Sequence, residues 1–119
     1  MTDVLYREEI LEHYKDPQNF GMLTSCDISS GQHNPFCGDE IQMYVKYHAE
    51  MVAEIGFTGN GCALAIAAAS ILTEYAKGKT KKELAVFSEE DMLTLLGIEV
   101  SETRKKCALL PLAVLKDCL

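Results

Sequence analysis

Apolar and polar residues alternate most regularly between Ile41 and Tyr47, where every second side chain is apolar. A period of two with one apolar face is typical of a β-strand that packs against a core on one side only. Residues 48–50 turn the chain, and residues 52–57 return as the antiparallel partner of this strand. The hairpin therefore brings Asp39, just before the first strand, to the same end of the sheet as the loop that follows the second.

Two longer helices lie on either side of this hairpin in the sequence. The first covers residues 3–15 and ends before Pro17, because the residue that precedes a proline is disfavoured in the α conformation. The alanine-rich residues 62–77 form the second helix, which Gly78 closes.

The C-terminal third predicts three further helices. Residues 80–86 and residues 88–95 each start with a hydroxyl residue that is followed three positions later by an acid, as in an N-terminal capping box. The last helix is expected to open at Cys107. Pro111 would break a helix already under way, so we expect it in the first turn of this one.

A weaker strand is predicted at residues 23–32, in which Cys26 packs inward on the same face as Ile28. Together these elements predict an α+β fold, with a three-stranded antiparallel sheet and helices packed mainly on one face. The chain has 119 residues, enough for one domain with a real core and too few for two. We therefore expect residues 1–119 to form a single domain.

Composition argues against several classes of function. The net charge of −7, from 18 acidic and 11 basic residues, disfavours nucleic acid as the main partner. No apolar run reaches the length that spans a membrane, and residues 1–14 lack the basic start and apolar middle of a signal peptide. Five cysteines in this setting indicate free thiols in a reducing compartment, the cytoplasm.

Three cysteines and one carboxylate make a candidate four-ligand metal site. Cys37 offers a soft thiolate and Asp39, two residues on, a hard carboxylate. Cys62 follows a glycine-rich loop at the same end of the hairpin, and Cys107 follows the basic residues 104–106, which would lower the pKa of its thiol. Such ligands suit zinc or an iron–sulfur cluster. A carboxylate binds cluster iron more weakly than a thiolate does. A site that must release its cluster would therefore benefit from one carboxylate ligand.

Plainer interpretations of single residues stay open. Cys37 by itself can be a turn cysteine without chemistry, and Cys118 an exposed bystander thiol beside the C-terminus. His13 and His48 are expected at the surface or at a strand end rather than on a metal. A cysteine hydrolase built on Cys37 and His33 is disfavoured, because no third residue that would orient the histidine is evident.

Four sequence blocks occur in order over nearly the whole chain: HYKDPQNFG at 13–21, NPFCGD at 34–39, GNGCA at 59–63 and RKKCA at 104–108. In these blocks the chain resembles the IscU-type iron–sulfur cluster assembly scaffolds, related to the N-terminal domain of NifU and to SufU. The resemblance implies that Cys37, Cys62 and Cys107 bind the cluster and accept sulfur. It also implies that Asp39 governs cluster release and that a cysteine desulfurase is the partner.

The chain departs from the IscU pattern at two points. Lys106 stands where IscU proteins typically carry a histidine, and residues 98–105 contain no Leu-Pro-Pro-Val-Lys segment for chaperone docking. The lysine is similar to SufU, but SufU carries an insertion between its second and third cysteines that is missing here. The chain therefore resembles a short scaffold without the specialised chaperone.

The leading hypothesis is a scaffold, not an enzyme, that assembles a transient cluster, expected to be [2Fe–2S], from iron and desulfurase-derived sulfur. The cluster then passes to apo iron–sulfur acceptor proteins. The alternative is a zinc-dependent sulfur acceptor, a SufU-like sulfurtransferase, and the same ligands would bind zinc in the isolated protein. Cys107 is the candidate sulfur acceptor in either case. A structural zinc module is the plainest alternative, and the oligomeric state, a homodimer included, stays open.

Overall fold

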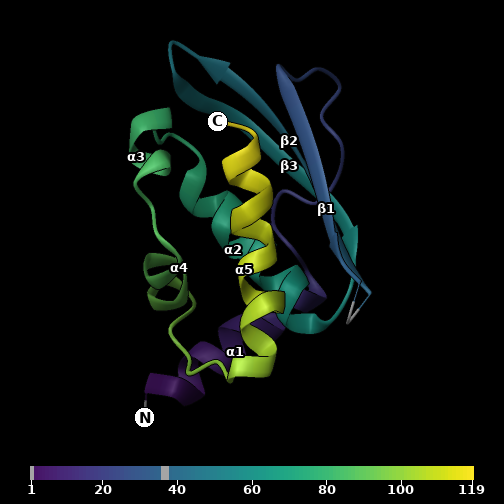
Figure 1. Ribbon diagram of the computed structural model, residues 1–119, viewed down its shortest axis with the longest axis vertical. Helices are drawn as coiled ribbons and strands as arrows, with labels where there is room; N and C mark the ends of the chain where they lie inside the picture. The colour runs from purple at the N-terminus through teal and green to yellow at the C-terminus, as the bar shows by residue number, and fades with distance from the viewer. Residues whose placement is uncertain (1, 36–37) are drawn as a thin grey trace.

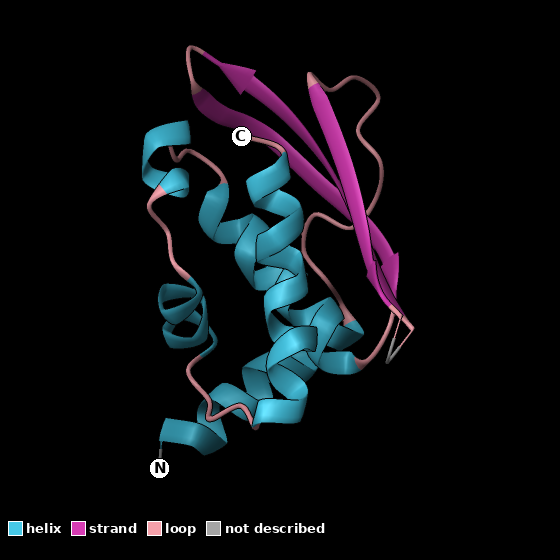
Figure 2. Ribbon diagram, viewed as in Figure 1, coloured by secondary structure: helices cyan, strands magenta, loops and turns pink. Residues whose placement is uncertain are grey.

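The computed structural model describes residues 2–35 and 38–119, with the backbone alone for residues 2–6. Its elements in chain order are α1 (Thr2–Lys15), β1 (Ile28–Asn34), β2 (Asp39–His48), β3 (Met51–Asn60), α2 (Ala63–Ala76), α3 (Lys81–Ala85), α4 (Glu89–Leu96) and α5 (Glu102–Asp117) (Figure 1). The strands form one antiparallel sheet in the order β1–β2–β3, and the helices pack mainly on one of its faces (Figure 2). The predicted α+β fold is confirmed.

The hairpin of β2 and β3 forms where the alternating pattern predicts it. Ile41, Met43 and Val45 are buried toward the helices, while the intervening side chains are partly exposed on the other face. Glu40 pairs with Asn60, so the first residues of β2 lie beside the last residues of β3. The predicted meeting of these two chain segments at one end of the sheet is therefore confirmed.

Strand β1, which the sequence predicts at residues 23–32, begins later than predicted, at Ile28. Asp27 still donates its backbone N–H to the carbonyl of Val45, but the preceding residues form bends and irregular structure rather than strand. Cys26 therefore lies two residues before the start of β1 and is exposed, which corrects the prediction that it packs inward.

The alanine-rich helix α2 lies at the centre of the molecule, in contact with α1, α5, α4 and β3. Its small side chains are fully buried over Ala67–Ala69 and allow neighbouring elements to approach closely. A polar link joins α2 to α1, because the hydroxyl of Ser70 lies 2.7 Å from Nδ1 of His13 and accepts the N–H of Gln18 at 2.8 Å. The side chain of His13 is only 12% exposed, so the expected surface position of this histidine is wrong.

The two short helices begin at the capping boxes that the sequence predicts. The hydroxyl of Thr80 accepts the N–H of Glu83, whose carboxylate accepts the N–H of Thr80 in return. Ser88 and Asp91 make the same reciprocal pair at the start of α4. These hydrogen bonds satisfy backbone N–H groups that the first turn of a helix leaves without an internal partner.

The last helix starts earlier than predicted, at Glu102, with Pro111 in its interior. Glu102 and residues 104–106 are good helix formers, and Lys105 donates to Glu102 at 2.8 Å across one turn. Pro111 removes one helical hydrogen bond, but its ring is buried with the core side chains of α5, so packing offsets the loss. Cys107 therefore lies in the second turn of α5 rather than at its start as predicted, and it is only 5% exposed.

Within the described part of the chain, no helix combines the length and the apolar character needed to cross a membrane.

Candidate metal centre

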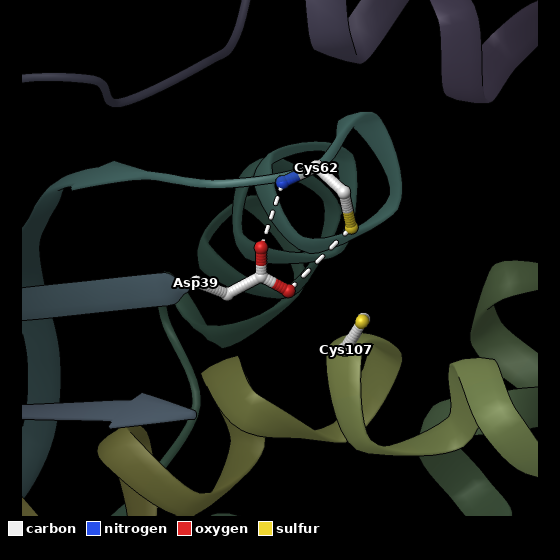
Figure 3. Close-up of side chains that lie close together, drawn as sticks. All are labelled: Asp39, Cys62 and Cys107. Carbon is white, nitrogen blue, oxygen red and sulfur yellow. Dashed lines mark hydrogen bonds between the residues drawn. The ribbon is translucent and has the colours of Figure 1, made fainter. Parts of the chain in front are cut away.

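Asp39 is the first residue of β2, and its side chain is almost completely buried. One carboxylate oxygen, Oδ1, accepts the backbone N–H of Cys62 at 2.8 Å. The other, Oδ2, accepts from the thiol of Cys62 at 3.5 Å (Figure 3). A buried carboxylate needs such donors, because burial without hydrogen bonds strongly disfavours the charged form.

Cys62 occupies the N-cap position of α2, with extended backbone angles of φ −70° and ψ 162°. Its own side chain makes no capping hydrogen bond, and the first turn of α2 contains no acid. Asp39 therefore supplies the negative charge that the positive end of the helix dipole favours, although it belongs to a different element. The prediction placed Cys62 in the first turn, one residue further into the helix.

Gly61 makes room for this contact. A Cβ atom on Gly61 would lie 2.5 Å from Oδ1 of Asp39 and 2.9 Å from its Cγ, far closer than a methyl group tolerates. The glycine before the cysteine thus has a steric role in letting the backbone approach the carboxylate. The sequence shows this glycine, but only the fold reveals that Asp39 is the group it accommodates.

Replacing Gly61 with alanine is therefore expected to displace the Asp39 carboxylate from the N–H of Cys62. We expect zinc affinity to fall by roughly 10-fold to 100-fold, the usual effect of disturbing the groups that orient metal ligands. Competition with a chromogenic chelator measures this change. Gly31→Ala, a substitution on β1 that faces Gln42 rather than Asp39, is the matched control and should leave zinc affinity unchanged. Equal zinc affinity in Gly61→Ala and the wild type would contradict the steric role.

Cys107 completes a cluster of three donor groups. Its sulfur, the sulfur of Cys62 and a carboxylate oxygen of Asp39 all lie within 4.8 Å of one another. Figure 3 shows the three side chains converging from three separate elements, β2, the start of α2 and α5. Sulfur ligands of a tetrahedral zinc ion lie roughly 3.8 Å apart, given Zn–S bonds of about 2.3 Å. The donor set therefore fits a thiophilic metal with only a small closure of the site.

Cys37, the remaining predicted ligand, lies outside the described residues, and its role stays a prediction. On either side of it, Asn34 pairs with Asp39, and Gly38 donates its N–H to the carbonyl of Asn34 at 2.9 Å. The φ angle of Gly38 is +72°, a left-handed conformation that glycine adopts without steric cost.

The other candidate residues lie away from this cluster. Cys118 is buried, which corrects the expectation of an exposed thiol, and burial is the main cause that raises its pKa to about 11. His48 is exposed at the end of β2, as expected. Arg104 is exposed, and Lys105 forms an ion pair with Glu102.

Comparison with known proteins assigns this chain to a family. The sequence profile described as the NifU-like N-terminal domain matches residues 5–119. The chain belongs to this family. The NifU-like chain is 42% identical to the zinc-dependent sulfurtransferase SufU of Bacillus subtilis over 77 residues, which cover 65% of this chain. The match spans about half of that relative, 52% of its length.

Two further relatives cover more of the NifU-like chain. The iron–sulfur cluster assembly scaffold protein IscU of Escherichia coli K12 is 31% identical over 109 residues, which cover 88% of this chain and 84% of IscU. A crystal structure from Fervidobacterium islandicum AW-1 has a TM-score of 0.78 and 27% identity, with 98% of each chain covered. That protein is described as a candidate iron–sulfur cluster assembly scaffold for the SUF system.

Proposed function

We propose that this chain is a scaffold on which an iron–sulfur cluster is assembled from iron and desulfurase-derived sulfur and then passed to apo-acceptor proteins. The observation that carries the proposal is the convergence of two thiols and one carboxylate within 4.8 Å, from three separate elements. Thiolates are the common ligands of iron–sulfur clusters, whereas a carboxylate is unusual in a cluster that stays bound permanently. Family membership supports the same class of function.

In this proposal Cys37, Cys62 and Cys107 bind the cluster iron, and Asp39 completes the set. The Asp39 carboxylate also has an alternative partner within the protein, the backbone N–H of Cys62. When an acceptor takes the cluster, the carboxylate can return to this N–H rather than stay buried without a donor. This second partner lowers the cost of releasing the carboxylate corner, which is the weakest of the four.

A second candidate function is a zinc-dependent sulfurtransferase. The similarity to SufU favours it, as does Lys106 in place of the histidine typical of IscU. Asp39, Cys62 and Cys107 would then hold zinc together with Cys37, and bound zinc keeps its cysteine ligands deprotonated. As a sulfurtransferase the chain would be an enzyme that transfers sulfur repeatedly, whereas a scaffold is not an enzyme.

In both candidate functions, the scaffold and the sulfurtransferase, we propose Cys107 as the residue that accepts sulfur. Its thiolate attacks the outer sulfur of the desulfurase persulfide, a new S–S bond forms, and the desulfurase thiolate leaves. Because Cys107 is only 5% exposed, docking of the desulfurase has to open the rim of the site, where the half-buried Cys62 lies. The proposed partners are a cysteine desulfurase and apo iron–sulfur proteins, and the reducing cytoplasm is the compartment in which these thiols stay reduced.

Anaerobic purification followed by reconstitution with iron, cysteine and a cysteine desulfurase separates the two functions. A scaffold is expected to turn brown, bind iron and sulfide in equal amounts, and give a Mössbauer spectrum of an iron–sulfur cluster. Tight zinc with sulfur acceptance and no cluster would contradict the scaffold and support the sulfurtransferase. Cys26→Ser, which changes an exposed thiol outside the site, is the control and should behave like the wild type.

A further inference from the structure

Strand β1 forms an open edge of the sheet, because it pairs with β2 on one side and with no strand on the other (Figure 2). The opposite edge, on β3, is closed at two places by other parts of the chain. Backbone hydrogen bonds join the outer side of Phe57 to Asn19 and Gly21, at 2.9 and 2.7 Å. The outer side of Val52 bonds in the same way to the loop that follows α2. Among the described residues, no such hydrogen bonds close the outer side of β1.

The pairing of the sheet shows which residues of β1 point outward. In an antiparallel strand, the N–H and the carbonyl of one residue point to the same side, and the side alternates along the strand. Phe57 uses both groups at the outer edge of β3, so its partner Met43 points away from β3 and toward β1. Met43 pairs with Ser30, which therefore points toward β2. The residues that alternate with Ser30 point outward: Ser29, Gly31 and His33.

The outer side of β1 has the properties of a strand that accepts another strand. Within the described part of the chain, nothing hydrogen-bonds to the backbone of Ser29, Gly31 or His33 on this side, and all three residues are exposed. Edge strands that avoid such pairing generally carry lysine, proline or a bulge. β1 contains no charged residue and no proline, and its register to β2 is continuous over all 7 of its residues. The edge therefore offers three N–H groups and three carbonyls to an extended strand.

The sequence of β1 is complementary to itself about a twofold axis at Gly31. In antiparallel pairing about this axis, Gly31 lies opposite Gly31 of a second copy, and Ser29 lies opposite His33 of that copy. Each of these outward pairs can exchange two backbone hydrogen bonds. No charged side chain of β1 meets its like, although each copy carries a net charge of −7. This uncharged strand is therefore suited to pairing between two acidic chains.

We propose that β1 pairs with β1 of a second copy, antiparallel about Gly31, and so joins two three-stranded sheets in a transient homodimer. The pairing is transient, because two short strands bury less than the roughly 1,200 Å² of a stable interface. Asn34, which pairs with Asp39 of the metal centre, lies about 10 Å along the strand from Gly31. The two metal centres consequently lie on opposite sides of the axis, and each stays complete within its own copy.

One carboxylate opposes this pairing. Asp117 lies over the inner face of β1, where it accepts from Gln32 at 2.6 Å and from Ser30 at 3.5 Å. The twofold axis brings it toward Asp117 of the second copy. Salt screens this repulsion and the repulsion between the two net charges, so we expect association to strengthen severalfold as the ionic strength rises. Asp117→Asn, which still accepts from Gln32, should strengthen association at low salt.

Sedimentation velocity of the full-length reduced chain, from about 10 µM to about 1 mM, measures the association over the range of weak complexes. We expect the weight-average mass to rise with concentration toward twice the monomer mass. A chain that stays monomeric throughout, at low and high salt, would overturn the proposal.

Ser29→Pro tests whether the dimer forms through this edge. The proline removes an outward N–H and leaves the bonds to β2 intact, as edge strands tolerate. We expect association to weaken by at least about tenfold, since backbone pairs at the centre of a short interface are lost. Ser29→Ala keeps the N–H and is the control that should associate like the wild type. Circular dichroism verifies that both variants are folded, and equal association of Ser29→Pro and Ser29→Ala would exclude the β1 edge.

Two double variants test the antiparallel register. Ser29→Glu with His33→Lys places opposite charges across the axis, whereas Ser29→Lys with His33→Lys places like charges there. The first should associate more strongly than the second, even though the second lowers the net negative charge of the chain. Equal association of the two double variants, or stronger association of the second, would overturn the register about Gly31.

Discussion

Asp39→Ala is expected to give a chain that still assembles a cluster, holds it longer in air and donates it roughly tenfold more slowly, within the range seen when groups around a metal site are changed. A carboxylate oxygen is a harder and weaker partner for cluster iron than a thiolate, so this corner opens first when an acceptor arrives. The substitution removes that corner and the alternative contact with the N–H of Cys62. A transfer time course, with cluster absorbance followed in parallel, measures both properties.

The same substitution is expected to lower the free energy of unfolding of the metal-free chain by about 1 kcal/mol, as the loss of an N-cap acceptor does. Asp39→Asn separates the two roles, because the amide oxygen can still accept the N–H of Cys62 but is a poorer metal ligand. Stability should then recover while slow transfer persists. Glu40→Ala, one residue further along β2 on the exposed face, is the control for lost charge. Faster transfer, or no cluster at all, in Asp39→Ala would contradict the release mechanism.

Cys107→Ser is expected to reduce persulfide acceptance from the desulfurase by at least about 100-fold, even where zinc still binds. A serine hydroxyl stays protonated near neutral pH and is a poor nucleophile toward sulfur, whereas a cysteine thiol reacts as its thiolate. Mass spectrometry after single turnover detects the transferred sulfur as a gain of about 32 Da.

Cys118→Ser is the matched control for Cys107→Ser, since it replaces a second buried cysteine near the other end of α5. It should retain sulfur acceptance. Unchanged acceptance in Cys107→Ser, together with loss in Cys62→Ser or Cys37→Ser, would assign the acceptor role to one of those cysteines. Of Cys62 and Cys107, the half-buried Cys62 has the more accessible thiol. It is therefore the main alternative to Cys107 as the sulfur acceptor.

The sequence by itself determined the elements that depend on short-range signals. The alternation at Ile41–Tyr47 specifies β2, and the reciprocal cap of Thr80 and Glu83 starts α3. Both follow from interactions between residues a few positions apart, which a linear pattern records. The hairpin also made it possible to predict that Asp39 and the loop before Cys62 lie at one end of the sheet.

Only the tertiary structure decided the burial of side chains outside the regular strand pattern and the contacts between distant elements. Pro111 lies inside α5 because core packing offsets the hydrogen bond that it removes, a balance that local propensity cannot show. Cys118 is buried and Cys26 is exposed because α5 ends against the sheet and β1 begins at Ile28. The contact between Asp39 and the N–H of Cys62 likewise depends on how β2 meets α2 in space. Contacts between distant elements, and the burial that they cause at element ends, are properties of the packed chain that a local pattern does not record.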